Sequence, residues 1–357
     1  MPVARHLLDL ISGLLALFAL LAGIQLAWQY WGSGLDVDTV SQRLESSVSV
    51  PFDRVEPARV IRDWHERQEP PAGRAPANGE IIGYLDIPRL GADWEKPIQE
   101  GVQQVVLDNM GVGHYPDTTL PGGRGNTSYA GHRAPADLGY LDRLEKGDVI
   151  YIRTASVWYR YETTGRPFTV PMSRVDVVAP TAVGVERGLT LTTCDPMFSV
   201  RPAVDRLIVH ATLTGWARVS DGMPAEYAHD AHDAGVTVRR TVRDLARTVH
   251  APVTGLLAAC TAVAWLVVDL TLWILCHRRM RDAWRDVTFS PLALLWRLQA
   301  GPYGWGPGGV PATLIRLVPA TLLLMAVTFA CWRWACPWIA DTIPLFASPH
   351  PAVGQRA

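Results

Sequence analysis

Three long apolar runs and one region of short apolar runs divide the chain. Residues 11–31, 252–276 and 310–335 form apolar stretches that are each long enough to span a bilayer as a helix. Between about residues 79 and 215 the apolar stretches shorten to strand length, and Gly, Pro and Asp separate them. The pattern therefore predicts three transmembrane helices and one β-rich domain.

The β-rich region contains eight strand-like segments. They are residues 81–87, 127–130, 148–153, 158–163, 168–170, 175–179, 189–193 and 207–213. Short strands at regular spacing favour a closed barrel or a sandwich. Two short helices are expected in the same region, at residues 102–109 and 137–143.

The remaining segments complete a domain plan. In chain order we expect a signal anchor (1–35), a linker (36–78), the β-rich domain (79–215), a linker with a basic amphipathic helix (216–250), a transmembrane helix (251–276), a basic cytoplasmic loop (277–309), a transmembrane helix (310–336) and a tail (337–357). Within the first linker, residues 55–68 carry a pattern compatible with a helix, and the Pro-rich residues 69–76 suggest a stiff connection.

Charges beside the apolar runs orient the chain. Arg5 precedes the first run, and Asp36 and Asp38 follow it, which places the N-terminus inside. No small-residue cleavage site is obvious, which favours an uncleaved anchor over a cleaved signal peptide. The loop 277–309 carries five arginines and is expected inside, so the β-rich domain is expected outside. Arginines just before the second run weaken the bias there, so the first run and this loop decide the orientation.

Composition narrows the function classes. The net charge of −1 gives no global basic field, so no nucleic-acid partner is expected. Four of the five cysteines lie in or beside the apolar runs, and only Cys194 lies in the polar domain. This distribution provides neither a disulfide framework nor zinc-ligand spacing. We expect no metal and no cofactor, because the His and Asp residues gathered at 229–233 read better as a solvated linker than as a ligand set.

Candidate chemistry gathers at the ends of three predicted strands. Cys194 ends a threonine-rich strand, His132 follows a strand-like run, and Arg206 opens the last strand. A cysteine, a histidine and an arginine supply a nucleophile, a general acid and base, and a group that stabilises an oxyanion. Taken alone, a lone domain cysteine is better explained as a small buried hydrophobic residue.

The ordered motifs that contain these residues resemble the sortases, the cysteine transpeptidases of Gram-positive cell surfaces. The resemblance rests on Thr190-Leu191-Thr192-Thr193-Cys194, on Gly131-His132-Arg133 and on Arg206 before the last strand, with further matches at residues 83–90, 111–116 and 120–126. It covers about residues 79–215. It implies an all-β sortase-type barrel of eight strands with short helices, to which the apolar runs add three transmembrane helices.

The resemblance also implies roles for individual residues. Cys194 would form a thioester with the substrate, His132 would act as acid and base, and Arg206 would hold the oxyanion. Thr193 would contribute its backbone or hydroxyl to substrate binding. Arg201 competes with Arg206, which is preferred because it directly opens the strand. The negative charge of Asp195 would disfavour the thiolate if it lies close.

The sortase class and the acceptor stay open. The motifs look most similar to class E, a housekeeping type that anchors surface proteins with LPxTG-like or LAxTG-like sorting signals to the cell wall. The amine acceptor would be a peptidoglycan precursor or a pilin lysine. Ala134-Pro135 and the extra residues 201–204 depart from that pattern, and the C-terminal spans are more typical of pilin-polymerising class C. Pro51-Phe52-Asp53 does not match the lid motif of pilin enzymes.

Two readings outside transpeptidation also remain at this point. The domain is compatible with a membrane-tethered cysteine hydrolase that uses water as the acceptor, and with an inactive module that binds sorting-signal peptides. The intact set of Cys194, His132 and Arg206 argues against the inactive module. The expected location is the cell membrane, with several spans and an extracellular catalytic domain.

Overall fold

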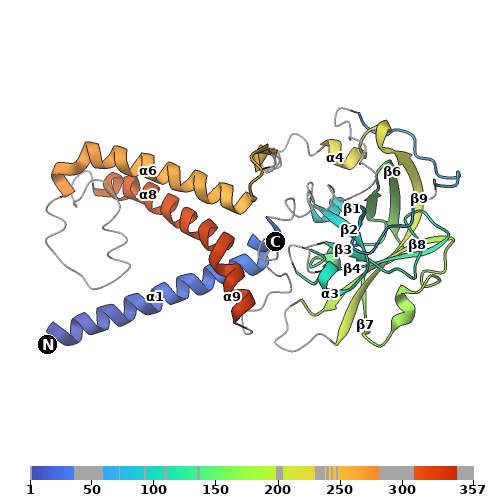
Figure 1. Ribbon diagram of the computed structural model, residues 1–357, viewed down its shortest axis with the longest axis horizontal. Coiled ribbons are helices and arrows are strands. Elements are labelled where there is room, and N and C mark those ends of the chain that lie inside the picture. The colour runs from blue at the N-terminus through green and yellow to red at the C-terminus, as the bar shows by residue number, and fades with distance from the viewer. Residues whose placement is uncertain are drawn as a thin grey trace. The chain divides into compact units, whose positions relative to one another are not determined.

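The computed structural model divides the chain into two units. It describes residues 2–35, 59–280 and 309–343, with gaps at 72, 92–93, 108–110, 135–136, 198–203, 230–237, 239–240, 243 and 247. One unit combines Met1–Gly32 with His250–Ala347, and the other combines Ser33–Val249 with Ser348–Ala357. The first unit is helical and the second is built around β-strands (Figure 1).

The helical unit contains the predicted long apolar helices. They are α1 (Pro2–Tyr30), α6 (Val253–Met280) and α8 (Gly309–Ala330); a π-helical turn, η8 (Cys331–Ala335), joins α8 to α9 (Cys336–Thr342). Three stretches are long and apolar enough to cross a membrane: His6–Gln29, Val253–Leu275 and Leu314–Ala340. The three predicted apolar helices are therefore confirmed, and α9 continues past the predicted end at residue 336.

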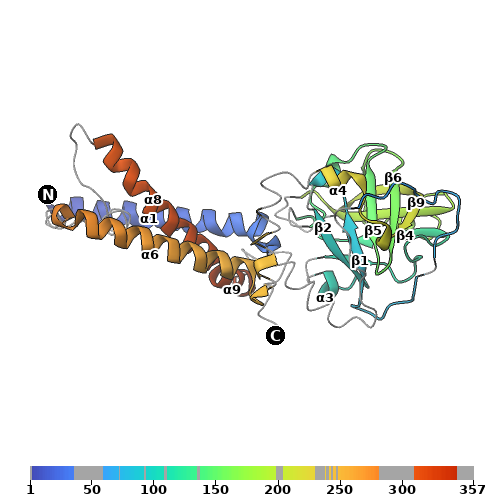
Figure 2. The same ribbon diagram turned by 90° about the horizontal axis from the view of Figure 1, so that it is seen from above.

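Contacts between distant parts of the sequence hold this unit together. α6 runs beside α8, as both views show (Figures 1 and 2). Near the end of α1, Ile24 and Trp28 pack against Cys336 and Ala340. The indole Nε1 of Trp332 donates to the Ile24 carbonyl oxygen at 3.1 Å. Apolar packing from α9 and a hydrogen bond from η8 thus connect the C-terminal end of this unit to α1.

The β-strands of the second unit form a closed barrel. The strands are β1 (Ile81–Asp86), β2 (Glu95–Glu100), β3 (Val112–His114), β4 (Gly125–Ala130), β5 (Val149–Arg153), β6 (Val157–Thr163), β7 (Phe168–Pro171), β8 (Arg187–Asp195) and β9 (Asp205–Arg218). Their order is β6-β5-β1-β2-β3-β4-β8-β9, and pairing of β6 with β9 closes the ring. The eight-stranded barrel is confirmed, and β7 is an added ninth strand along the first part of β9.

The barrel interior is apolar. Side chains alternate along each strand, so one set from every strand points into the core. The fully buried members include Leu85, Ile98, Val112, Tyr129, Ile150, Tyr161, Leu191 and Val209. Burial of a side chain of this size contributes roughly 1.5–3 kcal/mol, so this cluster sets the strand register.

Three sequence predictions for the barrel were wrong or incomplete. Residues 175–179 are not a strand: Val175–Val178 form a 3₁₀ turn, η4, in which only Val177 is buried, against Val170 and Ile208. Strands β2 and β3 were not predicted, because the sequence of β2 is polar and β3 is short. In β2, the polar residues Gln99 and Glu100 are nevertheless buried.

The expected short helices are present in reduced form. Residues 104–107 form α3 (Gln104–Leu107), and residues 108–110 lie outside the described part. Residues 137–143 form a turn followed by a 3₁₀ turn, η3 (Leu141–Arg143). In 55–68, the described residues are extended instead of helical, since Val60 and His65 form bridges to Met223 and Trp216.

Segments on both sides of the predicted domain pack on the barrel. The indole of Trp216 donates to the Gln68 carbonyl oxygen at 3.1 Å, and the Tyr159 hydroxyl donates to the Pro71 carbonyl oxygen at 3.2 Å. Ile61 and Tyr227, the latter in α4 (Ala225–His229), share a second apolar cluster with β-strand residues. The folded body therefore extends beyond residues 79–215. Described residues between 238 and 248 are helical, but the arginines of the predicted basic helix lie outside the described residues.

Candidate active site

Cys194 and Arg206 face each other across two paired strands. Cys194 lies near the end of β8, Arg206 lies near the start of β9, and the two residues are direct partners in the antiparallel register. Directly opposed residues place their side chains on the same face, with Cβ atoms about 4.5–5.5 Å apart. Both side chains are half-buried. The geometry thus places a thiol and a guanidinium side by side at the barrel rim.

His132 approaches Cys194 from the other side of β8. β4 runs parallel to β8, with Ala130 opposite Thr192. The pairing continues past the strand, because the Gly131 amide donates to the Thr192 carbonyl oxygen at 3.2 Å. His132 lies two residues after Ala130, and Cys194 lies two residues after Thr192. The parallel register therefore carries the histidine to the level of the cysteine.

Arg133 ties these two strand ends together. Its Nη1 donates to the Cys194 carbonyl oxygen at 3.4 Å and pairs with Asp195 Oδ1 at 3.2 Å. Its Nη2 lies 3.6 Å from Asp142 Oδ1, and its side chain is only 7% exposed. The Thr169 hydroxyl donates to Asp195 Oδ2 at 3.1 Å. The charge of Asp195 is thus compensated, which removes the concern that it disfavours the thiolate.

Sequence reasoning did not select Arg133. The sequence did contain a signal for its role. Arg133 directly follows His132, and the acidic residue Asp195 directly follows Cys194, at the ends of two strands that were predicted to meet. Opposite charges at two such positions are typical of an ion pair that fixes strand ends.

Arg206 has only uncharged hydrogen-bond acceptors among the described residues. Its Nη1 donates to the Asp205 carbonyl oxygen at 3.2 Å, and its Nη2 lies 2.9 Å from Met172 Sδ. No described carboxylate lies within ion-pair distance of this guanidinium. Its positive charge can therefore act on an incoming oxyanion.

Tyr115 is a further residue of the site that sequence reasoning did not select. Burial raises the pKa of Tyr115, the positive charge of Arg206 lowers it, and Cys194 raises it by a smaller amount. The Tyr115 phenol therefore lies within electrostatic range of the thiol and of the guanidinium. The residue follows β3, and its amide donates to the Ser128 carbonyl oxygen at 3.0 Å.

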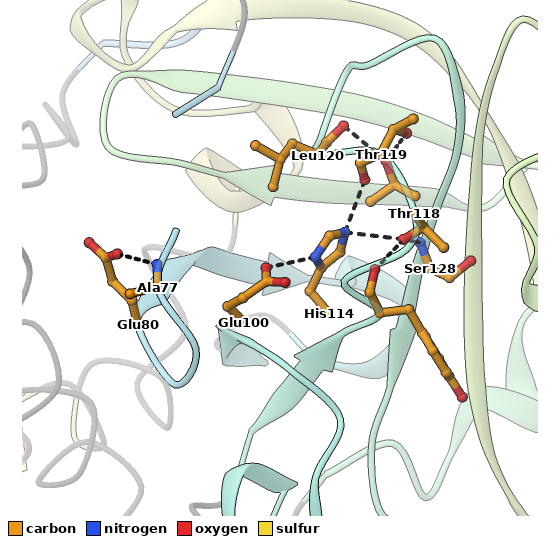
Figure 3. A network of polar contacts seen from close by, with 10 residues as sticks. Ala77, Glu80, Glu100, His114, Thr118, Thr119, Leu120 and Ser128 are labelled. Atoms are coloured by element: carbon orange, nitrogen blue, oxygen red, sulfur yellow. Dashed lines mark hydrogen bonds and ion pairs between the residues drawn. The ribbon is translucent and has the colours of Figure 1, made fainter. Parts of the chain in front are cut away.

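A buried histidine network supports the segment that carries Tyr115 (Figure 3). His114 is 2% exposed, and its Nδ1 lies 2.8 Å from Glu100 Oε2. Its Nε2 lies 3.0 Å from the Thr119 carbonyl oxygen, which only accepts, so Nε2 carries a proton. Thr118 Oγ1 donates to the Tyr115 carbonyl oxygen at 2.8 Å, accepts from the Ser128 amide at 3.1 Å and contacts His114 Nε2 at 3.2 Å. Both ring nitrogens of His114 are thus engaged by neighbouring residues of the barrel.

Asp137 lies beneath the histidine. It is 1% exposed, and its Oδ2 accepts a hydrogen bond from the His132 amide at 2.9 Å. Burial raises the pKa of Asp137 to about 7, while the charges of His132 and Lys96 and the His132 amide lower it. A buried carboxyl that titrates near neutrality beside a candidate acid–base residue is a feature that active sites often show.

The structure brings most of the predicted site residues together. Cys194, His132 and Arg206 converge at one rim of the barrel. Thr193 is 2% exposed, on the opposite face of β8 from Cys194, and its hydroxyl has no partner among the described atoms. Arg201 lies outside the described residues.

His210 and the His and Asp residues at 229–233 complete this comparison. His210, on β9, donates from Nε2 to the Val177 carbonyl oxygen of η4 at 3.2 Å, and burial lowers the pKa of His210. Within the described residues no group of three or more His, Cys, Asp or Glu is arranged to hold a metal ion. The side chains of the cluster at 229–233 lie outside that part of the chain.

Comparison with known proteins places this barrel in a family. A family model described as the sortase domain matches residues 85–214. The chain is 34% identical over 176 residues to sortase SrtE1 of Streptomyces coelicolor, covering 45% of this chain and 48% of that protein. It is 27% identical over 194 residues to sortase D of Bacillus subtilis, covering 54% and 94%. The chain thus matches about half the length of SrtE1.

Two solved structures are similar over the same region. The SrtA sortase from Actinomyces oris is 33% identical, with a TM-score of 0.42, covering 45% of this chain and 94% of that one. Sortase E from Streptomyces avermitilis is 34% identical, with a TM-score of 0.39, covering 43% and 99%. The closed barrel and the family model together define a sortase type of domain. The chain belongs to the sortase family through this domain, as the sequence motifs predict.

Proposed function

We propose that the protein is a membrane-anchored sortase that cleaves a sorting signal through Cys194 and transfers the acyl group to an amine. The observation that carries the proposal is the strand register, which opposes Cys194 to Arg206 and brings His132 level with the cysteine. This arrangement supplies a nucleophile, an acid and base, and an oxyanion donor within one rim.

The reaction follows from the three groups. The Cys194 thiolate attacks the scissile amide carbonyl, and the Arg206 guanidinium donates to the oxyanion that forms. As the C–N bond breaks, the His132 imidazolium gives its proton to the leaving amine, and a thioester remains. An incoming amine then attacks the thioester, His132 takes the amine proton, and the Cys194 thiolate leaves. No metal or cofactor is required, and Thr193 and Arg201 remain candidates for contacts with the substrate.

For the substrate, we propose a sorting signal of the LPxTG or LAxTG kind on a surface protein. The class E-like motifs support this choice, and so do the matches to SrtE1 and to SrtE2 of Streptomyces coelicolor, the latter at 25% identity. The acceptor would be a peptidoglycan precursor, and the transfer would anchor the substrate protein to the cell wall of a Gram-positive cell. A pilin lysine, as in class C, is the alternative acceptor.

We further propose a multi-pass arrangement with the barrel outside the cell. Three described stretches are long and apolar enough to cross a membrane, and the arginines of residues 277–309 favour the inside. Protease added to intact cells should degrade the barrel unit. It should leave an epitope inserted in the 277–309 loop intact until the cells are permeabilised. A loop epitope that is cleaved first would reverse the orientation.

The activity is tested with the full chain in lipid nanodiscs. LPxTG and LAxTG peptides are incubated with and without an added primary amine, and products are read by mass spectrometry. Cys194→Ala should abolish the amine-linked product, whereas Cys260→Ala, at an exposed position on α6, is the matched control. Cleavage that ignores the amine would instead favour a hydrolase, and peptide binding without turnover would favour a binding module.

A further inference from the structure

The buried carboxyl of Asp137 is a part of the site that the three motif residues do not explain. It opens the described turn at residues 137–140, which contacts the backbone of His132. The His132 amide donates to Asp137 Oδ2 at 2.9 Å, and the Leu138 amide donates to the His132 carbonyl oxygen at 3.2 Å. The amide and the carbonyl oxygen of His132 are thereby both hydrogen-bonded, the first to Asp137 and the second to Leu138.

The other carboxylate oxygen is buried without a hydrogen bond. Asp137 Oδ1 has no hydrogen-bond partner among the described atoms, although the side chain is 1% exposed. Leaving such an oxygen unpaired in the interior is costly, and natural proteins rarely do so without a reason. An asparagine would satisfy the His132 amide equally well and would avoid the buried charge. The presence of a carboxyl therefore points to a use of its charge.

Gly131 makes room for this carboxyl. A Cβ atom at position 131 would stand 2.8 Å from the Leu138 side chain and 3.2 Å from Asp137 Oδ1. The glycine of the Gly-His-Arg motif thus permits the turn to pack directly under the histidine. Arg133, the next residue, is directed away and pairs with Asp195 and Asp142.

We propose that Asp137 is a positioning residue for His132, which fixes its backbone and, as a carboxylate, favours the imidazolium form that protonates the leaving amine. The inference rests on the proposed function. The charged groups that act on Asp137 are His132, after β4, and Lys96, on β2, and both attract the carboxylate. A negative charge close to an imidazole stabilises its protonated form. Because the carboxyl is buried, water screens this effect only weakly.

A pair of substitutions separates the charge from the hydrogen bond. Asp137→Asn keeps the size and an oxygen acceptor for the His132 amide but removes the charge. Asp137→Ala removes both. Glu186→Gln is the matched control. It removes an exposed carboxylate directly before the start of β8, at the opposite end of the strand from Cys194, where Glu186 pairs with Arg124 and Arg187.

The direct measurement is the titration of the His132 imidazole. The full chain, labelled with ¹³Cε1-histidine, is studied by NMR in detergent micelles, and His132→Gln assigns the signal among the ten histidines. In Asp137→Asn the midpoint should move to lower pH, because the negative charge that attracts the imidazolium is gone. Glu186→Gln should leave it in place. Coincident midpoints in Asp137→Asn and Glu186→Gln would overturn the inference.

Transpeptidation supplies the second readout. At neutral pH the rate with Asp137→Asn should fall, by about tenfold for each unit by which the midpoint moves, and the optimum should shift to lower pH. A loss confined to Asp137→Ala would reduce Asp137 to a backbone cap and overturn the role of its charge. If the parent chain transfers no peptide but the titration still shifts, the proposed function fails while the coupling between Asp137 and His132 stands.

Discussion

Cys194 and Arg206 are direct cross-strand partners, although eleven residues separate them in the sequence. The pairing means that the same backbone hydrogen bonds that close the barrel also set the spacing of thiol and guanidinium. We therefore expect a substitution at either position to leave the backbone position of the other unchanged.

Removal of the Arg206 guanidinium should slow the chemical step. Arg206→Gln is expected to lower kcat about 10²–10³-fold with a smaller effect on KM, the range seen when one oxyanion donor is lost. Arg206→Lys should recover only part of the rate, because a lysine lacks the planar fork of donors. Steady-state kinetics of peptide transfer by the full chain provides the measurement.

Arg201→Gln is the matched comparison for this experiment, because the sequence offers Arg201 as the competing oxyanion donor. We expect a smaller loss there than at Arg206. The reverse order, with Arg201→Gln the more damaging substitution, would transfer the role to Arg201.

The pair of Arg133 and Asp195 should contribute to both folding and geometry. Arg133→Gln removes a nearly buried cation that holds the Cys194 carbonyl and the Asp195 carboxylate. We expect a loss of about 1.5–3 kcal/mol in the stability of the barrel, the range for hydrogen bonds to charged groups. Thermal unfolding followed by tryptophan fluorescence of the full chain in detergent gives the difference.

A double-mutant cycle isolates this interaction. Asp195→Asn in the Arg133→Gln background should cost less than in the parent chain, because its partner is already gone. Additive losses would show that the two side chains do not act on each other.

The buried pair of His114 and Glu100 should be more sensitive than any exposed ion pair. Glu100→Ala leaves a buried His114 nitrogen without its 2.8 Å partner, and the removal of one member of a buried pair typically costs about 3–5 kcal/mol. The melting temperature of the barrel should fall accordingly, and the fixed position of Tyr115 should be lost with the Thr118–Thr119 contacts.

An exposed pair provides the control for this prediction. Asp176→Asn breaks the exposed pair with Arg174, and we expect almost no change in stability because water screens this pair. Equal losses at Glu100 and Asp176 would mean that the His114 network adds nothing to stability.

The parts of this site that the sequence predicted are those that depend on local patterns, and the parts it missed depend on residues far apart in the chain. Cys194, His132 and Arg206 were predictable because each stands at the end of an apolar strand within an ordered set of motifs. Arg133 was not, since its partner Asp195 lies 62 residues away and only the parallel register of β4 and β8 brings the two together.

Fold predictions failed where polarity and burial disagree. The polar sequence of β2 argued against a strand, yet Glu100 is buried because His114 on β3 offers it a partner. Residues 175–179 have the apolar content of a strand, yet only Val177 reaches the apolar layer beside β9, so a 3₁₀ turn suffices. Both errors come from tertiary partners that a local pattern does not contain.

The stability of the barrel should depend on pH through Asp137. Burial raises the pKa of Asp137 to about 7, whereas an unfolded aspartate titrates at about 3.9. The folded state therefore binds this proton more tightly, so its stabilising contribution is complete below pH ~4 and is lost as pH rises to about 7. The difference corresponds to about 4 kcal/mol. The melting temperature of the parent chain, compared with that of Asp137→Asn, should fall across this interval.

Asp137→Asn cannot ionise at this position, so above neutral pH it should be the more stable chain while transferring peptide more slowly. This opposition is the expected sign of a charge kept for function at a cost in folding. Glu186→Gln, at an exposed carboxylate, should track the parent chain across the same pH range. If the melting temperatures of the parent chain and Asp137→Asn run parallel from pH 4 to pH 8, then Asp137 does not titrate in this interval, and its carboxylate has no stability cost to offset.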